Sequence, residues 1–175
     1  IVDRLVEDTG NDPDQLPILQ HALMRTWDFW QSSRLDDQPI DIPHYEAIGT
    51  MKEALSRHAE EVYNELPDTH SRLITEKLFK LLTNLGEDSR GTRRPTSLAE
   101  ICKITDSKEE QVVNVIESFR QPERSFLMPP ITTDLLPETM IDISHESLMR
   151  VWIRLRSWVE EETKSAELYL RLSKS

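Results

Sequence analysis

The sequence predicts a mainly α-helical fold, with a helical bundle in its first part and a smaller mixed region, containing a short β-hairpin, in its second part. Three observations predict this fold. Glycine is scarce, with 4 residues among 175. Apolar residues recur three and four positions apart over most of the chain, which is the spacing of an amphipathic helix. Stretches containing proline or glycine separate these periodic segments, and such stretches interrupt helices.

The first half of the chain contains three periodic segments, each predicted to be an amphipathic helix. Their repeating positions are Leu16, Leu19, Leu23, Trp27 and Trp30; Met51, Leu55, His58, Val62 and Leu66; and Ile74, Leu78, Leu81 and Leu85. Breaks are expected at residues 10–13, 34–43, 67–68 and 86–95. His58 is interpreted as a core histidine, because no second metal-binding or hydrogen-bonding side chain shares its face. Trp27 and Trp30 are interpreted as core or interface anchors.

The second half is predicted to combine short strands with helices. We expect an edge strand at 93–96, helices at 97–103 and 107–120, and two strands at 125–128 and 140–143. Ser107 and Glu110 match a capping box at the start of the second helix. The loop between the last two strands holds Pro129, Pro130 and Pro137, which end strand pairing there.

This order of elements is that of a winged-helix domain, in which the last hairpin forms the wing. The segment from His145 onward has Leu148, Trp152 and Leu155 at helical spacing and is expected to continue as a kinked helix towards Leu172. The predicted organisation has three parts. They are a helical domain at 1–66, a winged-helix domain at 67–159 and a helical linker at 160–175 that leads to a downstream domain.

Composition restricts the partners that the chain can have. The net charge is −11, from 32 acidic and 21 basic residues, so binding to nucleic acid is not expected. Helix 107–120 itself carries three glutamates against Lys108 and Arg120, and the basic run Arg90, Arg93 and Arg94 is interpreted as a solvated loop. A DNA-binding winged helix remains an alternative, on fold analogy alone.

The same sequence argues against membrane insertion and for a reducing compartment. No apolar run approaches the ~18 residues that span a bilayer, and the N-terminus lacks the apolar core of a signal peptide. The first residue is Ile1 and not Met, which suggests a piece of a longer protein. Cys102 is the only cysteine and lies among apolar residues, so we expect core packing and a cytoplasmic location.

Motifs for catalysis are incomplete. His145 and Glu146 supply the first half of a zinc-protease signature, but the second histidine is replaced by Met149, so no metal site is predicted. Gly86 and Gly91 have the spacing of a phosphate-binding loop, but the lysine and hydroxyl that should follow are absent. We therefore expect no catalytic residue and no enzyme activity in this chain by itself.

Three stretches carry a resemblance to a known family. The segment "DQLPILQHALMRTW" (14–27) resembles the region after the nucleotide-binding core of STAND-class NTPases, which are AAA+-related signalling switches. The segments "HYEAIGTMKEALSRHAEEVYNEL" (44–66) and "ISHESLMRVWIRLRSW" (143–158) resemble later parts of the same proteins, particularly bacterial ones with a WD-repeat propeller downstream.

This resemblance implies a non-catalytic regulatory module that closes over a nucleotide and relays its ADP or ATP state. The implied partners are an upstream P-loop NTPase domain and a downstream repeat sensor domain, with oligomerisation of the whole protein on activation. The chain itself holds no cofactor on this reading, and ADP or ATP with Mg is expected in the longer protein. The alternative is a protein-interaction scaffold without nucleotide binding.

Two residues receive nucleotide-binding roles from the resemblance. Pro17 matches the family's Leu-Pro proline, which packs near the adenine, although Asp14 and Gln15 stand where the family usually has glycine. The alternative is that Pro17 only begins a helix. His145 resembles the histidine of a His-Asp motif that contacts the β-phosphate of ADP, with Glu146 in place of Asp. Here Ser144 is expected to cap the following helix, and the alternative is a histidine used for packing or capping.

Overall fold

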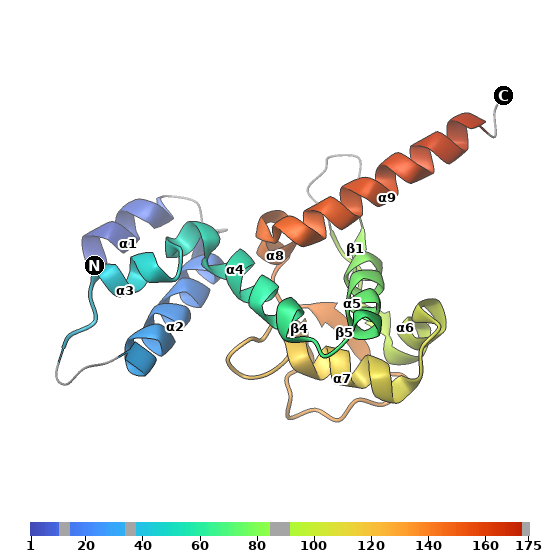
Figure 1. Cartoon of the computed structure of the whole chain (residues 1–175), viewed down its shortest axis with the longest axis horizontal. Helices are drawn as coiled ribbons and strands as arrows, with labels where there is room; N and C mark the ends of the chain where they lie inside the picture. Colours follow the sequence, from blue (N-terminus) through green and yellow to red (C-terminus); the bar gives the residue numbers. More distant parts are fainter. Residues whose placement is uncertain (11–14, 34–37, 85–91, 173–175) are drawn as a thin grey trace.

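The computed structural model describes residues 1–10, 15–33, 38–84 and 92–172, and this part of the chain is mainly helical (Figure 1). The helices are α1 (Val2–Thr9), α2 (Leu16–Ser33), α3 (Ile42–Ala47), α4 (Thr50–Glu65), α5 (Thr69–Leu81), α6 (Leu98–Thr105), α7 (Glu109–Phe119), α8 (Glu146–Val151) and α9 (Ile153–Leu172). The strands are β1 (Thr83–Asn84), β2 (Thr92–Arg93), β3 (Thr96–Ser97), β4 (Leu127–Met128) and β5 (Met140–Ile143). The mainly α fold and the small antiparallel strands are therefore confirmed.

Helix α2 is where it was predicted, but the face that it buries is different. It packs on α3 and α4 through Ile18, Ala22 and Thr26. By contrast, Leu16 and Trp27 are 58% and 49% exposed. Ala22 and Thr26 are small, so α2 can approach α4 closely on their side, and the larger side chains are left on the outside. Trp27 is therefore not a core residue, and of the two predicted roles only that of an interface anchor stays a prediction.

Helix α4 confirms its predicted spacing. Met51, Leu55, Val62 and Leu66 are buried, and His58 is buried with them. The helix begins after Gly49, which has a φ of 86°. A Cβ on Gly49 would lie 2.9 Å from Cβ of Glu53, so the left-handed turn and the close approach both require glycine.

Helix α5 begins as predicted but ends earlier. Asp68 caps it, since its side chain accepts a 2.7 Å hydrogen bond from the amide of Ser71. The helix ends at Leu81 and the chain continues into β1, which pairs antiparallel with β2. Leu82 is fully buried, and Leu85, which was expected to extend the helix, lies outside the described residues.

Helices α6 and α7 lie beside a three-stranded antiparallel sheet of order β3-β5-β4. Two short strands replace the expected single strand at 93–96, because Pro95 interrupts the chain between β2 and β3. The predicted capping box of α7 is also wrong. Asp106 is in the left-handed region, which leaves Ser107 outside the helix, and Gln111 Oε1 accepts the hydrogen bond from the amide of Lys108 instead.

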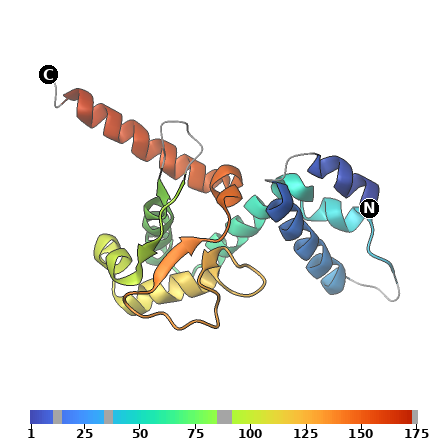
Figure 2. The same cartoon turned by 180° about the vertical axis from the view of Figure 1, so that it is seen from behind.

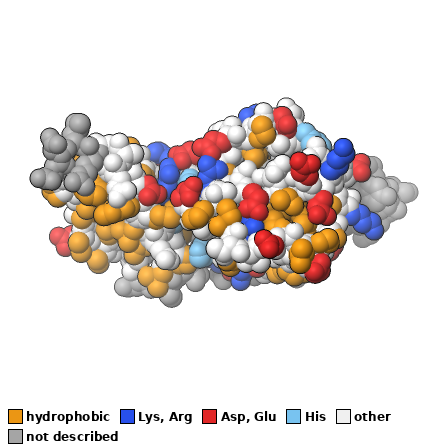
Figure 3. All heavy atoms as spheres, turned by 90° about the horizontal axis from the view of Figure 1, so that it is seen from below, with side chains coloured by type: hydrophobic (Ala, Val, Ile, Leu, Met, Phe, Trp, Pro, Cys, Tyr) orange, Lys and Arg blue, Asp and Glu red, His pale blue; other side chains and the backbone are white. Residues whose placement is uncertain are grey.

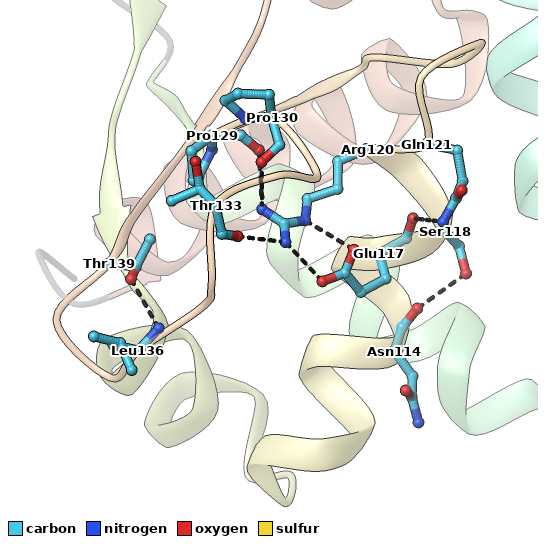
Figure 4. A network of polar contacts seen from close by, with 10 residues as sticks. All are labelled: Asn114, Glu117, Ser118, Arg120, Gln121, Pro129, Pro130, Thr133, Leu136 and Thr139. Carbon is cyan, nitrogen blue, oxygen red and sulfur yellow. Dashed lines mark hydrogen bonds and ion pairs between the residues drawn. The ribbon is translucent and has the colours of Figure 1, made fainter.

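The loop between β4 and β5 is held by Arg120 at the end of α7 (Figure 4). Its guanidinium donates to the carbonyl oxygens of Pro129 and Pro130, both at 3.1 Å, and of Thr133 at 2.8 Å. It also donates to both carboxylate oxygens of Glu117, at 2.9 and 2.8 Å. Because Arg120 is only 3% exposed, this network is a buried support of the predicted wing.

The C-terminal segment is two helices that meet at Trp152, in agreement with the predicted kink. Leu148, Trp152 and Leu155 are buried as expected. Helix α4 lies between the N-terminal helices and the sheet region, and α9 extends away from both (Figures 1 and 2). Within the described ranges, none of the helices combines the length and the apolar character needed to cross a membrane.

Candidate functional site

Pro17 and His145, the two residues with predicted nucleotide roles, line the same cavities although they come from distant parts of the chain. The larger cavity has a volume of about 350 Å³ and also contacts Leu55 and Phe126. The smaller one has a volume of about 250 Å³ and contacts Arg93 and Arg150. The structure thus brings one residue of α2 and one residue at the start of α8 to a single place.

Pro17 is the second residue of α2. At this position the missing backbone N–H of proline breaks no helical hydrogen bond, which agrees with the prediction. Its ring is partly exposed and borders both cavities. An apolar ring at this point can pack against a flat ligand such as a purine base.

His145 follows β5 and is itself the N-cap residue of α8. The expected cap at Ser144 is therefore wrong, because strand pairing continues through that residue: its amide donates to the carbonyl of Phe126 at 3.0 Å. The His145 side chain makes no capping hydrogen bond, so the imidazole is not used to begin the helix. This removes the capping alternative for His145.

His145 is an exposed residue that borders both cavities. The partial burial of its imidazole lowers the pKa of the ring, and the positive charge of Arg93 lowers it further. At neutral pH the ring is therefore uncharged, and burial is the main cause. A neutral imidazole still offers one N–H donor to an anion.

A pair of histidines, His21 and His58, lies beside the larger cavity, and His21 is one of the residues that line it. Nδ1 of His58 on α4 is 3.2 Å from Nε2 of His21 on α2. Both rings also contact Phe126, with centroid distances of 5.1 Å from His58 and 5.6 Å from His21. His58 is a core histidine as predicted, but its partner was missed, because His21 lies on another helix and no local spacing connects the two.

The environment keeps both of these histidines uncharged at neutral pH. Burial and the charge of Arg25 lower the pKa of His21 to about 4, and His145 contributes to this shift. Burial is also the main cause that lowers the pKa of His58 to about 3, with Arg25 next. A neutral pair can share one N–H between the two facing nitrogens, so the contact satisfies both rings without a metal ion.

Arginines near His145 were also missed by the sequence interpretation. Arg93 was assigned to a solvated loop, but its Nη1 donates to Asp142 Oδ2 at 3.0 Å and to the carbonyl of Ile143 at 3.2 Å. Arg150 lies one helical turn after Glu146 and borders the smaller cavity. The basic character of the 93–94 stretch was visible in the sequence, but its pairing with β5 was not.

Across the described ranges, histidine, cysteine, aspartate and glutamate side chains nowhere form a group of three that could hold a metal ion. Met149, which replaces the second histidine of a zinc signature, is buried in the core. The cavities present the ring of Pro17, uncharged imidazoles, guanidinium groups and the carboxylate of Glu146. The apolar ring and the N–H donors among these groups suit an organic anion with a flat apolar part.

Comparison with models of protein families assigns the chain to a class of protein, the STAND NTPases. The matching model is described as Novel STAND NTPase 1, and the match covers residues 1–175. The chain belongs to this family. Comparisons with curated proteins and with solved structures gave no match.

Proposed function

We propose that this chain is the regulatory helical module of a STAND-type signalling NTPase. In this role it closes over a nucleotide held by a P-loop domain elsewhere in the longer protein, and it contributes no catalytic residue. The observation that carries the proposal is the shared position of Pro17 and His145 on the same two cavities. Membership of the STAND family supports it.

The proposed nucleotide lies with its adenine beside Pro17 and its diphosphate beside His145. The larger cavity offers apolar contacts from Met24, Leu55 and Leu148 as well as Pro17, which suit a base better than a charged group. The neutral imidazole of His145 would donate its N–H to the β-phosphate. A hydrogen bond to a charged acceptor is stronger than one between neutral groups.

A contact of this kind makes the chain sensitive to the state of the nucleotide. A ligand shifts a conformational equilibrium only by its difference in affinity for the two states. We propose that ADP favours the closed arrangement through His145 and that ATP with Mg favours an open one. The α5–α7 and β3–β5 region would act as a winged-helix domain that passes this change to a downstream repeat domain.

The test replaces His145 by alanine in the longer protein that carries the P-loop domain. We expect ADP to bind roughly 10- to 100-fold more weakly, as for the loss of one hydrogen bond to a charged group. ADP release, followed with a fluorescent analogue, should be faster, and signalling output should rise. The matched control is His70→Ala, which removes an exposed histidine at the start of α5, away from both cavities.

Stability of the present chain distinguishes a binding role from a packing role. His145→Ala should leave thermal unfolding close to that of the wild type, since the side chain makes no capping bond and the buried Leu148 and Trp152 remain in place. Unchanged ADP affinity together with strong destabilisation would show that His145 is a packing residue and that the proposal is wrong.

A further inference from the structure

The smaller cavity is lined by two arginines, in a chain whose net charge is −11. It is bordered by Pro17, Arg93, Arg150 and residues 144–147. The charged side chains that line it are two guanidinium groups and one carboxylate, and a second carboxylate, Asp142, is paired with Arg93. Two guanidinium groups at one cavity offer several N–H donors to an anionic ligand.

The carboxylate that lines the cavity, Glu146, lies between the two arginines. Its Oε1 is 3.9 Å from Nε of Arg93, and its Oε2 is 3.6 Å from Nη2 of Arg150. Both distances are longer than a hydrogen bond, and all three side chains are close to half exposed. Ion pairs with this geometry contribute little to stability, so another anion can replace the carboxylate at low cost.

Arg93 is held in place by contacts that do not involve Glu146. Its Nη1 donates to Asp142 and to the carbonyl of Ile143, both on β5. These bonds fix the guanidinium against the strand and direct its Nε towards Glu146. The position of Arg93 therefore does not depend on the carboxylate that it faces, as expected for a binding group that is arranged before the ligand arrives.

A phosphate group suits this arrangement better than the carboxylate does. Guanidinium groups bind phosphate oxygens with pairs of parallel hydrogen bonds, and a diphosphate has enough oxygens to contact two arginines and an imidazole together. His145 is adjacent to Glu146 in the chain and borders the same cavity. The three donors thus surround one space, which the Glu146 carboxylate partly occupies.

We infer that Arg93 and Arg150 form a phosphate-binding pair beside His145, and that Glu146 is an internal anion that the diphosphate of a nucleotide displaces. This inference rests on the proposed function and adds two binding residues and one competing residue to it. When the phosphate is absent, Glu146 neutralises part of the arginine charge. When the phosphate binds, the carboxylate turns outward to solvent.

Two substitutions with opposite expected effects test the inference on this chain. Glu146→Gln removes the competing charge and should tighten binding of inorganic pyrophosphate by roughly fivefold, the effect of one like charge at about 4 Å in a water-exposed site. Arg150→Gln removes an attracting charge and should weaken binding by a similar or larger factor. The titrations are followed by 1H-15N NMR of backbone amides and of arginine Nε groups.

The chain offers a matched control pair on α9. Arg156 and Glu160 are also four residues apart, with a distance of 3.9 Å and similar exposure, but they do not border either cavity. Arg156→Gln and Glu160→Gln change the net charge by the same amounts and should leave pyrophosphate binding within about twofold of the wild type. Thermal unfolding of all four variants shows whether each is folded.

The outcomes separate this inference from the proposed function. The inference is wrong if pyrophosphate does not bind, or if Glu146→Gln and Arg150→Gln behave like the α9 controls. Parallel titrations with ADP and adenosine test the nucleotide role itself. If ADP and adenosine bind at the Pro17 cavity and neither Glu146→Gln nor Arg150→Gln changes their affinity, the inference is wrong and the proposed function is still supported. If the two substitutions change pyrophosphate binding but ADP binds no more tightly than pyrophosphate, the arginines form an anion site that does not recognise the adenosine part of a nucleotide. The inference would then hold, and the proposed nucleotide role would be wrong.

Discussion

At the scale of single residues, Arg120 shows how far a side chain can depart from its local pattern. In the sequence it counts as a surface charge at the end of helix 107–120. In the structure it is buried and donates to three loop carbonyls and to Glu117. The loop backbone between β4 and β5 has few partners from its own strands at these points, so one guanidinium satisfies several of its carbonyl groups at once.

We predict that Arg120→Met lowers the free energy of unfolding by about 3 kcal/mol. Methionine fills similar space but leaves the carbonyls of Pro129, Pro130 and Thr133 and the Glu117 carboxylate without this donor. Urea unfolding measures the change, and hydrogen exchange at the Thr133 amide should become faster. Arg156→Met, at an exposed arginine, is the control. A loss below about 0.5 kcal/mol would mean that water replaces the arginine without cost.

At the scale of elements, the junction of α4 with α9 depends on one ion pair and an aromatic cluster. Arg154 at the start of α9 forms a hydrogen-bonded ion pair with both carboxylate oxygens of Glu60 on α4, with 2.9 Å between Nε and Oε2. Its guanidinium lies 4.2 Å from the ring centroid of Tyr63. Trp152 Nε1 donates to the same Glu60 at 3.3 Å. These contacts determine the direction in which α9 leaves the rest of the molecule.

We predict that Arg154→Met destabilises the chain by about 1 kcal/mol, less than the change at Arg120. The pair with Glu60 is about one third exposed, so solvent screens it, and Met retains contact with Tyr63. The larger effect should be local, with faster hydrogen exchange in the first turns of α9. Arg156→Met, two residues further along α9 and on another side of the helix, should leave that exchange unchanged. If the amides in the first turns of α9 exchange at the same rate in both variants, the packing of Trp152 alone holds α9 in place.

At the scale of the whole molecule, the N-terminal helices meet the sheet region through the His21 and His58 pair and Phe126. Arg25 and Arg124 lie around this contact, and each is paired with a glutamate, Glu61 and Glu65 respectively. Protonation of either histidine would place a further positive charge beside these arginines. Acid should therefore weaken the connection between the two parts of the molecule.

We predict that stability falls as the pH drops from about 6.5 towards 4. The pKa values of His21 and His58 are lowered on folding to about 4 and about 3, so the unfolded chain binds more protons in this window. Their contribution is complete above pH 6.5, the ordinary histidine pKa, and is lost progressively below it. The loss should be roughly 3 kcal/mol between pH 6.5 and 5, about half of it from each histidine.

Urea unfolding at several pH values measures this effect. In the double variant His21→Gln/His58→Gln the slope of stability against pH in that window should become smaller, whatever its stability at pH 7. His70→Gln, at an exposed histidine, should keep the slope of the wild type. A double variant with an unchanged slope would assign the acid sensitivity to carboxylates elsewhere.

The exposed apolar side chains of α2 form part of a larger apolar surface that is seen only in the whole molecule. Figure 3, seen from below, shows apolar side chains gathered over its left half, where the N-terminal helices lie. Leu16, Leu23 and Trp27 of α2 are among the exposed apolar residues. Periodicity located this stripe correctly, but it could not decide whether the stripe or the opposite face is buried.

The sequence by itself determined the mainly helical class, the longer helices, the strands β4 and β5, and the family, but it did not predict α1, α3 or β1. Apolar spacing located α4 and α5, and Asp68 and Ser97 marked helix starts, because helices form by hydrogen bonds between near neighbours and end where local side chains replace them. The STAND resemblance, now confirmed as family membership, also depended on linear motifs. The winged-helix arrangement and the nucleotide roles of Pro17 and His145 stay predictions.

Tertiary structure decided everything that joins distant segments. It brought Pro17 to His145, placed His21 against His58, buried Arg120 under the β4–β5 loop and turned Arg93 towards β5. None of these contacts has a local signal, since each joins residues on different elements whose relative positions follow from packing of the whole core. The candidate site consists of such contacts, so its residues were partly visible in the sequence and its geometry was not.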